Sequence, residues 1–229
     1  MTPEITTRSF TNDQFVFDNV FFSNCYRLKG VKENGPVIVD IGAHAGFFSF
    51  SALTLGASKI YSFEPLIDNM KILLSNTYNR HFLGRVTPYQ LGVYTESIIG
   101  KFHAPKLIDG IFFDLSSVGL SSGEESNFYS CQCHNLDTIL KEYCFDESID
   151  ILKINIGYAE REILLNSELL SKNVKAICGE VSCGEQEMVE FKRSMGLRGY
   201  VNFFSFSPNQ EGRTIFLASV NQLSDHFNI

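Results

Sequence analysis

Residues 37–64 read VIVDIGAHAGFFSFSALTLGASKIYSFE, and this stretch decides the fold. An apolar run ends in Asp40, a loop with two glycines follows, and a helical pattern of apolar residues stops at Gly56. A second β-rich run then ends in Glu64. This order predicts strand, glycine loop, helix and strand, with a carboxylate at the end of each strand. In open α/β sheets, ligands bind outside this edge.

The spacing of the glycines indicates which ligand the edge accepts. A dinucleotide site has the pattern G-x-G-x-x-G, whereas this loop has Asp40, Gly42 and Gly46 and lacks the middle glycine. A carboxylate beside the loop repels a pyrophosphate but suits ammonium and hydroxyl groups, both of which S-adenosylmethionine carries. Glu64 is expected to accept hydrogen bonds from the two ribose hydroxyls. The alternative is a strand–helix turn that needs glycine only for its backbone angles.

The sequence therefore predicts a site for S-adenosylmethionine, formed by the loop and by the end of the second strand. Its expected residues are Asp40, Gly42, Ala43, His44, Gly46, Phe47, Glu64 and Pro65. An NAD-dependent oxidoreductase is a distant alternative, because the middle glycine of its fingerprint is missing.

Composition and charge narrow the class of protein. The 229 residues are 44% hydrophobic and 20% charged, which fits one α/β domain spanning residues 1–229. The net charge of −7 argues against nucleic acid or an anionic membrane surface as a partner. We see no apolar stretch with the length of a signal peptide or a membrane span, so a cytoplasmic location is expected.

The six cysteines raise the question of metal binding. Cys131 and Cys133 alternate along a predicted strand, so they share one face while His134 points to the other. Zinc would need further donors in tetrahedral geometry, and no second paired motif supplies them. We expect free thiols and no metal site.

The remaining segments predict a mostly parallel sheet with an antiparallel C-terminal hairpin and helices on both faces. Residues 1–35 are expected to be an aromatic-rich leading segment or lid, anchored by Phe15, Phe17, Phe21 and Phe22. Residues 91–97 and 100–104 predict an added hairpin, and residues 105–130 predict a polar loop over the acceptor side. Further strands are predicted at 85–90, 149–156, 174–181, 201–206 and 214–220, and helices at 66–78, 136–143, 158–166 and 186–195.

From about Tyr26 to its end, the chain resembles FkbM-type S-adenosylmethionine-dependent methyltransferases. Four segments carry the resemblance: VDIGAHAG at 39–46, SFEP at 62–65, LDTIL at 136–140 and IDILKINIGYAE at 149–160. The first occurs across class I methyltransferases, and the third and fourth together point to this family. The resemblance implies a Rossmann-like class I methyltransferase sheet and methyl transfer from S-adenosylmethionine.

The fourth segment departs from the family pattern Leu-Lys-Ile-Asp-x-Glu-Gly-x-Glu. Asn155 stands where the family has aspartate, and Gly157 and Tyr158 stand where it has glutamate and glycine. Lys153 and Glu160 are kept. Asparagine can orient a hydroxyl but cannot take its proton. If the family's aspartate serves as a base, this chain has lost it.

Methylation of a hydroxyl requires an acceptor held in line and a group that removes its proton. Glu180, at the end of a predicted strand, is the first candidate base, although an exposed strand-end acid is an equal alternative. Glu160 is either a second candidate or a solvent-facing helix residue. Lys153 is expected to pair with a carboxylate across the sheet, and Asn155 to orient the acceptor. The histidines considered are His44, His103 and His134.

Two functions follow from the sequence. The first is O-methylation of a hydroxyl on a small molecule or glycan with S-adenosylmethionine as the cofactor. The alternative is a catalytically impaired S-adenosylmethionine-binding protein of the same fold, with Asn155 and Gly157 as the marks of lost activity.

Overall fold

The structure is a computed structural model, and it describes residues 4–29, 35–78, 82, 84–103, 106–108, 111–113, 128–157, 159–207 and 213–229. For residues 103, 106–108, 111–113 and 128, it describes the backbone alone.

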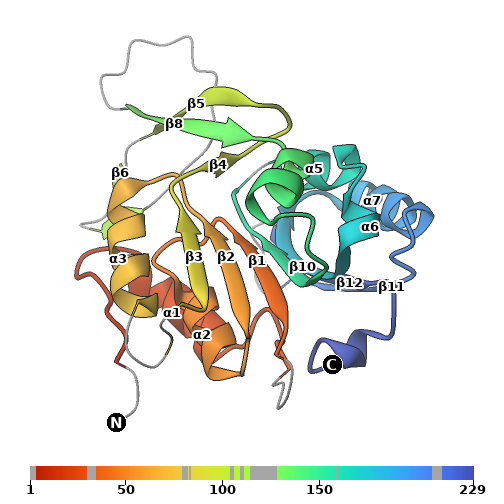
Figure 1. The fold of residues 1–229 in the computed structure, drawn as a ribbon, viewed down its shortest axis with the longest axis horizontal. Helices are drawn as coiled ribbons and strands as arrows, with labels where there is room; N and C mark the ends of the chain where they lie inside the picture. Colours follow the sequence, from red (N-terminus) through yellow and green to blue (C-terminus); the bar gives the residue numbers. More distant parts are fainter. Residues whose placement is uncertain are drawn as a thin grey trace.

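A seven-stranded sheet forms the centre of the molecule (Figure 1). Its spatial order is β11 (Asn202–Phe206), β12 (Arg213–Ser219), β10 (Val174–Ser182), β9 (Ile149–Ile154), β1 (Val37–Ile41), β2 (Lys59–Phe63) and β3 (Val86–Tyr89). The strands from β10 to β3 pair in parallel, whereas β12 is antiparallel to both β10 and β11. The predicted mostly parallel sheet with an antiparallel C-terminal hairpin is confirmed.

The chain reverses its direction of travel across the sheet between β1 and β9. Strands β1, β2 and β3 proceed to one side, and β9, β10 and the last two strands proceed to the other. Such a switch point leaves the loops after the two central strands free to diverge, and ligands bind there in open α/β sheets. The loop after β1 and the loop after β9 therefore define the edge that carries the candidate site.

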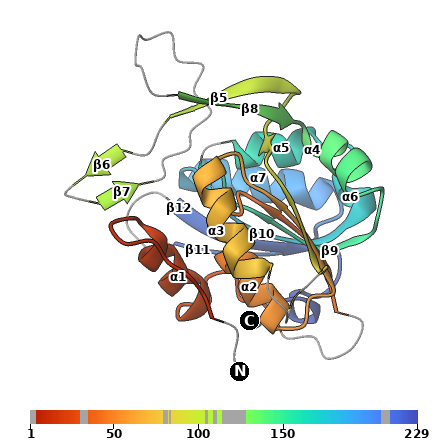
Figure 2. The same cartoon turned by 60° about the vertical axis from the view of Figure 1, so that its left-hand side comes forward.

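Helices cover both faces of the sheet, as Figures 1 and 2 show. The first group is α1 (Asp13–Phe21), α2 (Phe47–Thr54) and α3 (Ile67–Thr77), and the second is α4 (Leu136–Thr138), a π-helical turn (Ile139–Tyr143), α5 (Glu160–Asn166), α6 (Leu170–Asn173) and α7 (Glu185–Leu197). A short 3₁₀ turn (Leu223–Asp225) lies near the C-terminus. Strands with apolar residues at consecutive positions are buried on both faces, as expected for a covered parallel sheet.

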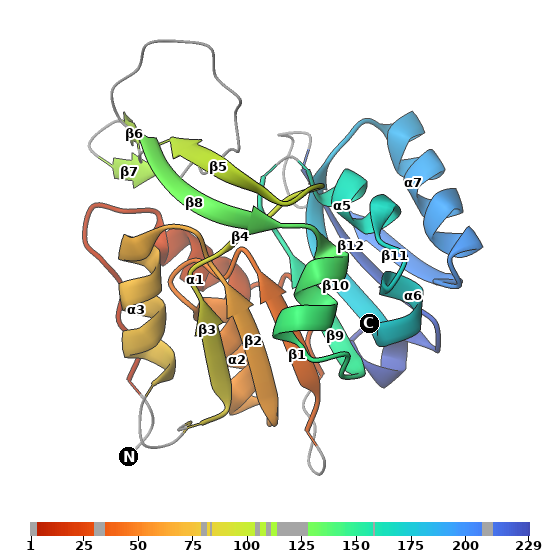
Figure 3. The ribbon, with the colours of Figure 1, turned by 45° about the horizontal axis from the view of Figure 1, so that its top comes forward.

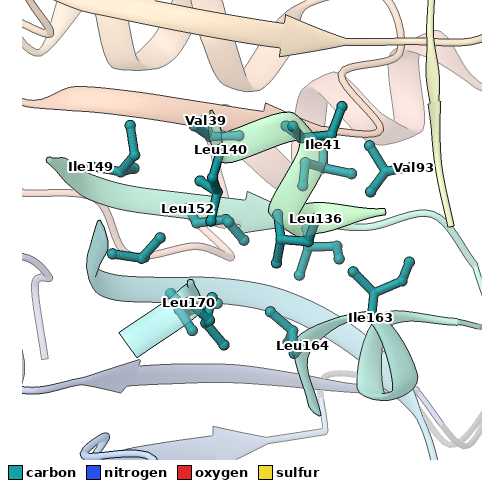
Figure 4. Close-up of a cluster of buried hydrophobic side chains, with 14 of the residues drawn as sticks. Val39, Ile41, Val93, Leu136, Leu140, Ile149, Leu152, Ile163, Leu164 and Leu170 are labelled. Carbon is teal, nitrogen blue, oxygen red and sulfur yellow. The ribbon is translucent and has the colours of Figure 1, made fainter. Parts of the chain in front are cut away.

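The larger hydrophobic core lies between the sheet and the second group of helices (Figure 4). Ile41, Leu152 and Leu164 are among its fully buried side chains. On the opposite face, α1 and α2 bury a second cluster that includes Phe47, Phe48 and Leu217. The two cores hold the central strands rigidly, so the loops at their carboxyl ends start from fixed positions.

A smaller sheet lies above the carboxyl ends of the central strands (Figure 3). Its order is β4 (Gly92–Val93), β8 (Phe128–His134) and β5 (Ile98–His103). The predicted hairpin of residues 91–104 is therefore wrong in its pairing: β4 and β5 both pair with β8, β4 in parallel and β5 antiparallel. Strand β8 therefore lies between β4 and β5, and its Cys131 and Cys133 form a small buried cluster with Phe102.

The expected polar loop 105–130 is partly strand, since β6 (Lys106–Ile108) pairs with β7 (Ile111–Phe113) and β8 begins at residue 128. The rest of this segment lies outside the described residues. The predicted helix 136–143 consists of α4 and the π-helical turn. The side chain of Asn135 caps it by accepting a hydrogen bond from the Thr138 N–H at 2.9 Å.

The aromatic leading segment forms helix α1, and only part of its predicted anchoring is correct. Phe17 and Phe21 stack on one face of the helix, with ring centroids 4.6 Å apart, and pack towards α2. Phe15 and Phe22 are 60% and 78% exposed. Helical periodicity explains the difference, because residues four apart share a face whereas residues two apart do not.

Candidate functional site

Three residues of the glycine loop after β1 adopt the left-handed backbone conformation. Gly42 has φ 73°, His44 has φ 53° and Gly46 has φ 80°. A Cβ atom at Gly42 would lie 2.0 Å from the carbonyl oxygen of Asn155, so no other residue fits there. The loop therefore lies directly against the chain that leaves β9.

Helix α2 starts immediately after this loop, and its N-cap residue, Gly46, has no side chain that could cap the first turn. The first N–H groups of a helix have no partner within the helix, and they favour a negatively charged ligand. The Phe47 ring is buried against Phe17, so only the backbone of Phe47 is available to a ligand.

Asp40 lies inside the protein and not at its surface. Its Oδ1 is 3.0 Å from Lys153 Nζ, and its Oδ2 accepts a hydrogen bond from Ser49 Oγ at 2.7 Å. Lys153 Nζ also donates to the carbonyl oxygen of Gly42 at 2.7 Å. The expected pairing of Lys153 with a carboxylate is present, and this pair ties β1, β9 and the glycine loop together.

Glu64, at the end of β2, is 3% exposed and accepts three hydrogen bonds. Its Oε2 accepts from the His44 N–H at 2.8 Å, and its Oε1 accepts from the Leu66 N–H and from Asn69 Nδ2. Burial raises the pKa of Glu64. Pro65, the next residue, is half-buried and directs the chain into α3.

His44 lies between two acidic residues. Its Nε2 is 3.8 Å from the fully buried Asp13, and its backbone N–H reaches Glu64. Arg8 binds both carboxylate oxygens of Asp13. Burial alone would raise the pKa of Asp13, but the hydrogen bonds from Arg8 outweigh it and lower that pKa. The start of α1 is thus fixed against the glycine loop.

A row of polar side chains crosses the carboxyl ends of the strands on the other side of the switch point. Asn155 Nδ2 donates to the Tyr26 hydroxyl at 3.1 Å and to Glu180 Oε2 at 3.3 Å. Arg213 donates to Glu180 Oε1 at 3.0 Å. Both amide hydrogens of Asn155 are engaged, so its Oδ1 has a fixed direction. We call Tyr26, Asn155, Glu180 and Arg213 the polar row.

Glu160 has a local structural task. Its Oε1 accepts hydrogen bonds from the N–H groups of Ile156 and Gly157, at 2.7 and 2.6 Å. Burial raises the pKa of Glu160, and the charge of Glu180 adds to the effect. The alternative that Glu160 is a solvent-facing helix residue is therefore wrong. Glu160 is buried, and the loop after β9 folds around its carboxylate.

The histidines and Tyr158 stand apart from the polar row or outside the described chain. Both ring nitrogens of His134 lie 3.1 Å from a hydroxyl oxygen, those of Ser97 and Tyr143. The side chain of His103 and all of Tyr158 lie outside the described residues.

The residues at this edge fit S-adenosylmethionine. Among the described residues, the buried Oδ1 of Asn69, beside Glu64, has no hydrogen-bond partner, and an acceptor oxygen of this kind fits a ligand that carries hydroxyl groups. The uncapped turn of α2 offers N–H groups to a carboxylate. Glycine at position 42 lets the loop lie directly against the backbone of Asn155. Cofactor roles for the predicted residues, and catalytic roles for Glu180, Asn155, Glu160 and Lys153, stay predictions.

Sequence reasoning missed Tyr26, Asn69 and Arg213. Tyr26 is separated from Asn155 by more than a hundred residues, and its ring is hidden among many aromatic neighbours in sequence. The position of Arg213 beside Glu180 depends on strand register, because β12 pairs with β10 so that Arg213 lies opposite Ser182. Asn69 could have been identified from the sequence, because it lies five residues after Glu64, in the first turn of the helix that follows β2.

The described part of the chain contains no group of three or more His, Cys, Asp or Glu side chains that could hold a metal ion. All six thiols are free, and burial raises the pKa of Cys133 to about 11 and that of Cys25 to about 12. None of the described helices has both the length and the apolar character of a membrane span.

Comparisons with known proteins agree with this geometry. The sequence profile of the methyltransferase FkbM domain matches residues 40–212. The structure is similar to a methyltransferase FkbM from Methylobacillus flagellatus KT, with 15% identity over 88% of this chain and a TM-score of 0.51; the match spans 47% of that longer protein. It is also similar to TrmK of M. capricolum in complex with S-adenosylhomocysteine, with 10% identity over 87% of this chain and 67% of that one, and a TM-score of 0.50. No curated protein sequence gives a significant match.

Proposed function

Because this chain belongs to the FkbM methyltransferase domain family, we propose that it transfers a methyl group from S-adenosylmethionine to a hydroxyl of a small molecule or glycan. Methyl transfer is the activity of the family. The hydroxyl acceptor and the roles of individual residues are our proposal. The net charge of −7 favours such an acceptor over nucleic acid.

One observation supports the proposal above all others: the close approach of Gly42 to Asn155. The glycine loop is the side proposed for the cofactor, and Asn155 belongs to the polar row. Their contact leaves no space for even a Cβ atom between the two loops. A methyl donor held by one loop and an acceptor held by the other would therefore be neighbours, which is the main requirement of a direct displacement.

Each group at the edge has a proposed task. S-adenosylmethionine, when bound, supplies the methyl group from its sulfonium. Glu64 and Asn69 accept hydrogen bonds from the ribose hydroxyls, and the first turn of α2 donates to the carboxylate. Asn155 Oδ1 orients the acceptor hydroxyl, and Glu180 takes its proton. Glu160 keeps the loop that carries Asn155 in place.

A second candidate has its own supporting observation. Glu180 is held by both Arg213 and Asn155, and Glu160 is occupied by backbone N–H groups. Each carboxylate oxygen of Glu180 thus already has a hydrogen-bond partner within the protein, and an acceptor hydroxyl would have to compete with Arg213 and Asn155 for it. The chain would then bind S-adenosylmethionine without transferring its methyl group.

Calorimetric titration with S-adenosylhomocysteine tests the cofactor site first. We expect micromolar binding to the wild type and a loss of at least ten-fold in Glu64→Gln, because that substitution removes the charge that accepts hydroxyl hydrogens. Exposed Glu190→Gln, with the same change of charge on α7, is the matched control. Equal binding by wild type and Glu64→Gln would reject the assignment, and no binding by the wild type would reject the proposed function.

Transfer of a labelled methyl group to a panel of sugars and hydroxylated small molecules separates the two candidates. The methyltransferase hypothesis expects at least one labelled acceptor and a loss of label in Glu180→Gln. The impaired-protein hypothesis expects cofactor binding without labelling in the wild type, and labelling only after Asn155→Asp.

A further inference from the structure

Arg27, the residue after Tyr26, differs from the ion-paired arginines of the described chain. Arg8, Arg161 and Arg213 each form an ion pair with a carboxylate. Arg27 forms none among the described residues. Its guanidinium instead lies over the rings of Phe204 and Phe206, 5.6 and 4.9 Å from their centroids. Aromatic faces attract a guanidinium but do not occupy its N–H groups.

Strand register places this cation on the same face as the polar row. Glu180 lies opposite Ile215, and Ile215 lies opposite Phe206. Residues that oppose one another in antiparallel pairs project from the same face. Phe206 is two strands from Glu180, a separation of about 10 Å at the usual spacing between strands. Arg27 thus extends the row beyond Arg213, towards the edge of the sheet.

The backbone at Arg27 is held in an uncommon conformation. Its φ is 49°, in a region that non-glycine residues seldom adopt. The Arg27 N–H donates to the carbonyl of Asn24, and the Arg27 carbonyl accepts from the N–H of Asn228. Residues held in such conformations cluster at ligand sites, where the surrounding structure fixes a side chain in place.

We propose that Arg27 binds an anionic group of the methyl acceptor, a carboxylate, sulfate or phosphate, on the same face of the sheet as Glu180 and above the strand two positions away. The inference rests on the proposed function, since it places the acceptor hydroxyl at Asn155 and Glu180. A half-buried planar guanidinium binds such a group through two parallel N–H bonds. The net charge of −7 disfavours an anion elsewhere on the surface, so the Arg27 guanidinium gives this group one defined position. The acceptor that spans both points is extended, like an acidic oligosaccharide.

Binding of three oligosaccharides to the S-adenosylhomocysteine-loaded protein tests the inference. They are a hyaluronan tetrasaccharide with carboxylates, a sulfated chitotetraose and the neutral chitotetraose. We expect at least one charged oligosaccharide to bind roughly ten-fold or more tightly than the neutral one, a preference that Arg27→Gln abolishes. Arg27→Lys keeps the charge but not the planar fork and should lose part of the preference. Arg193→Gln, an exposed arginine on α7, should keep it all.

Equal or absent binding of charged and neutral oligosaccharides would overturn the inference. So would a preference that survives in Arg27→Gln, or one that Arg193→Gln removes equally. Thermal melting verifies that each variant folds, and Arg27→Lys decides the matter if Arg27→Gln does not fold. Affinity for S-adenosylhomocysteine should be unchanged in Arg27→Gln. Failure of the wild type to bind it would contradict the proposed function and not the anion site.

Discussion

Replacing Lys153 by methionine should destabilise the protein strongly. Lys153 and Asp40 have side chains that are 5% and 0% exposed, with Nζ and Oδ1 3.0 Å apart. Methionine fills similar space but leaves the Asp40 carboxylate buried with Ser49 as its remaining hydrogen-bond partner. Breaking a buried pair from one side costs about 3–5 kcal/mol. For a domain of this size that corresponds to a fall in melting temperature of roughly 6–20 °C.

Urea unfolding of a double-mutant cycle measures the effect. Removing both charges, in Asp40→Leu with Lys153→Met, should recover at least half of the lost free energy of unfolding, because no buried charge is left unpaired. The matched control is the pair of Lys71 and Asp68, whose side chains are 65% and 61% exposed. Lys71→Met should cost about 0.5 kcal/mol or less. The reasoning is refuted if Lys153→Met costs under about 1 kcal/mol, or if the two substitutions simply add.

Three further outcomes are expected. Burial raises the pKa of Glu64 above its ordinary 4.5, so the folded protein holds the proton of this carboxyl more tightly than the unfolded chain does. The contribution of Glu64 to the free energy of unfolding therefore falls as pH rises from about 4.5 through the folded pKa. Glu64→Gln should remove that slope from urea unfolding measured against pH. Gly42→Ala should prevent folding or lower the melting temperature far more than Gly84→Ala, which has a similar φ of 79° but open space around it and should cost about 1 kcal/mol. Asn135→Ala should cost about 1 kcal/mol in chemical denaturation, because it removes the cap of α4, and an unchanged midpoint would contradict the cap.

Much of the fold was predictable because its strands are short apolar runs between clear turn signals. The unit from Val37 to Glu64 has one reasonable interpretation, and helix α7 with the final antiparallel pair follows from local patterns. The pairing of β4 and β5 was not predictable, since it depends on β8, which arrives about thirty residues later in the chain. Helix α1 was also missed, because phenylalanine occurs on both its faces and hides the helical period.

The candidate site also combines local features, which the sequence predicts, with contacts between distant segments, which it does not. The glycine loop and Glu64 are local features of the sequence, and the structure brings them together through the hydrogen bond from His44 to Glu64. The interior position of Asp40 follows from its contact with Lys153, which a motif cannot show. The polar row depends on register between β9, β10 and β12 and on a segment that precedes β1. No spacing in the sequence carries that information.

The polar row can form only late in the synthesis and folding of the chain. The glycine loop, Glu64 and α3 all lie between residues 42 and 77, whereas the row needs Tyr26, which precedes β1, and Arg213, which begins β12. Moreover, the segment that carries Tyr26 is fastened by a bridge between Leu28 and Phe227. A chain still being synthesised, or cut after β10, therefore lacks the row even if its first strands have formed. Under the proposed function, acceptor recognition is reserved for chains that have closed completely, and incomplete copies cannot compete for the acceptor.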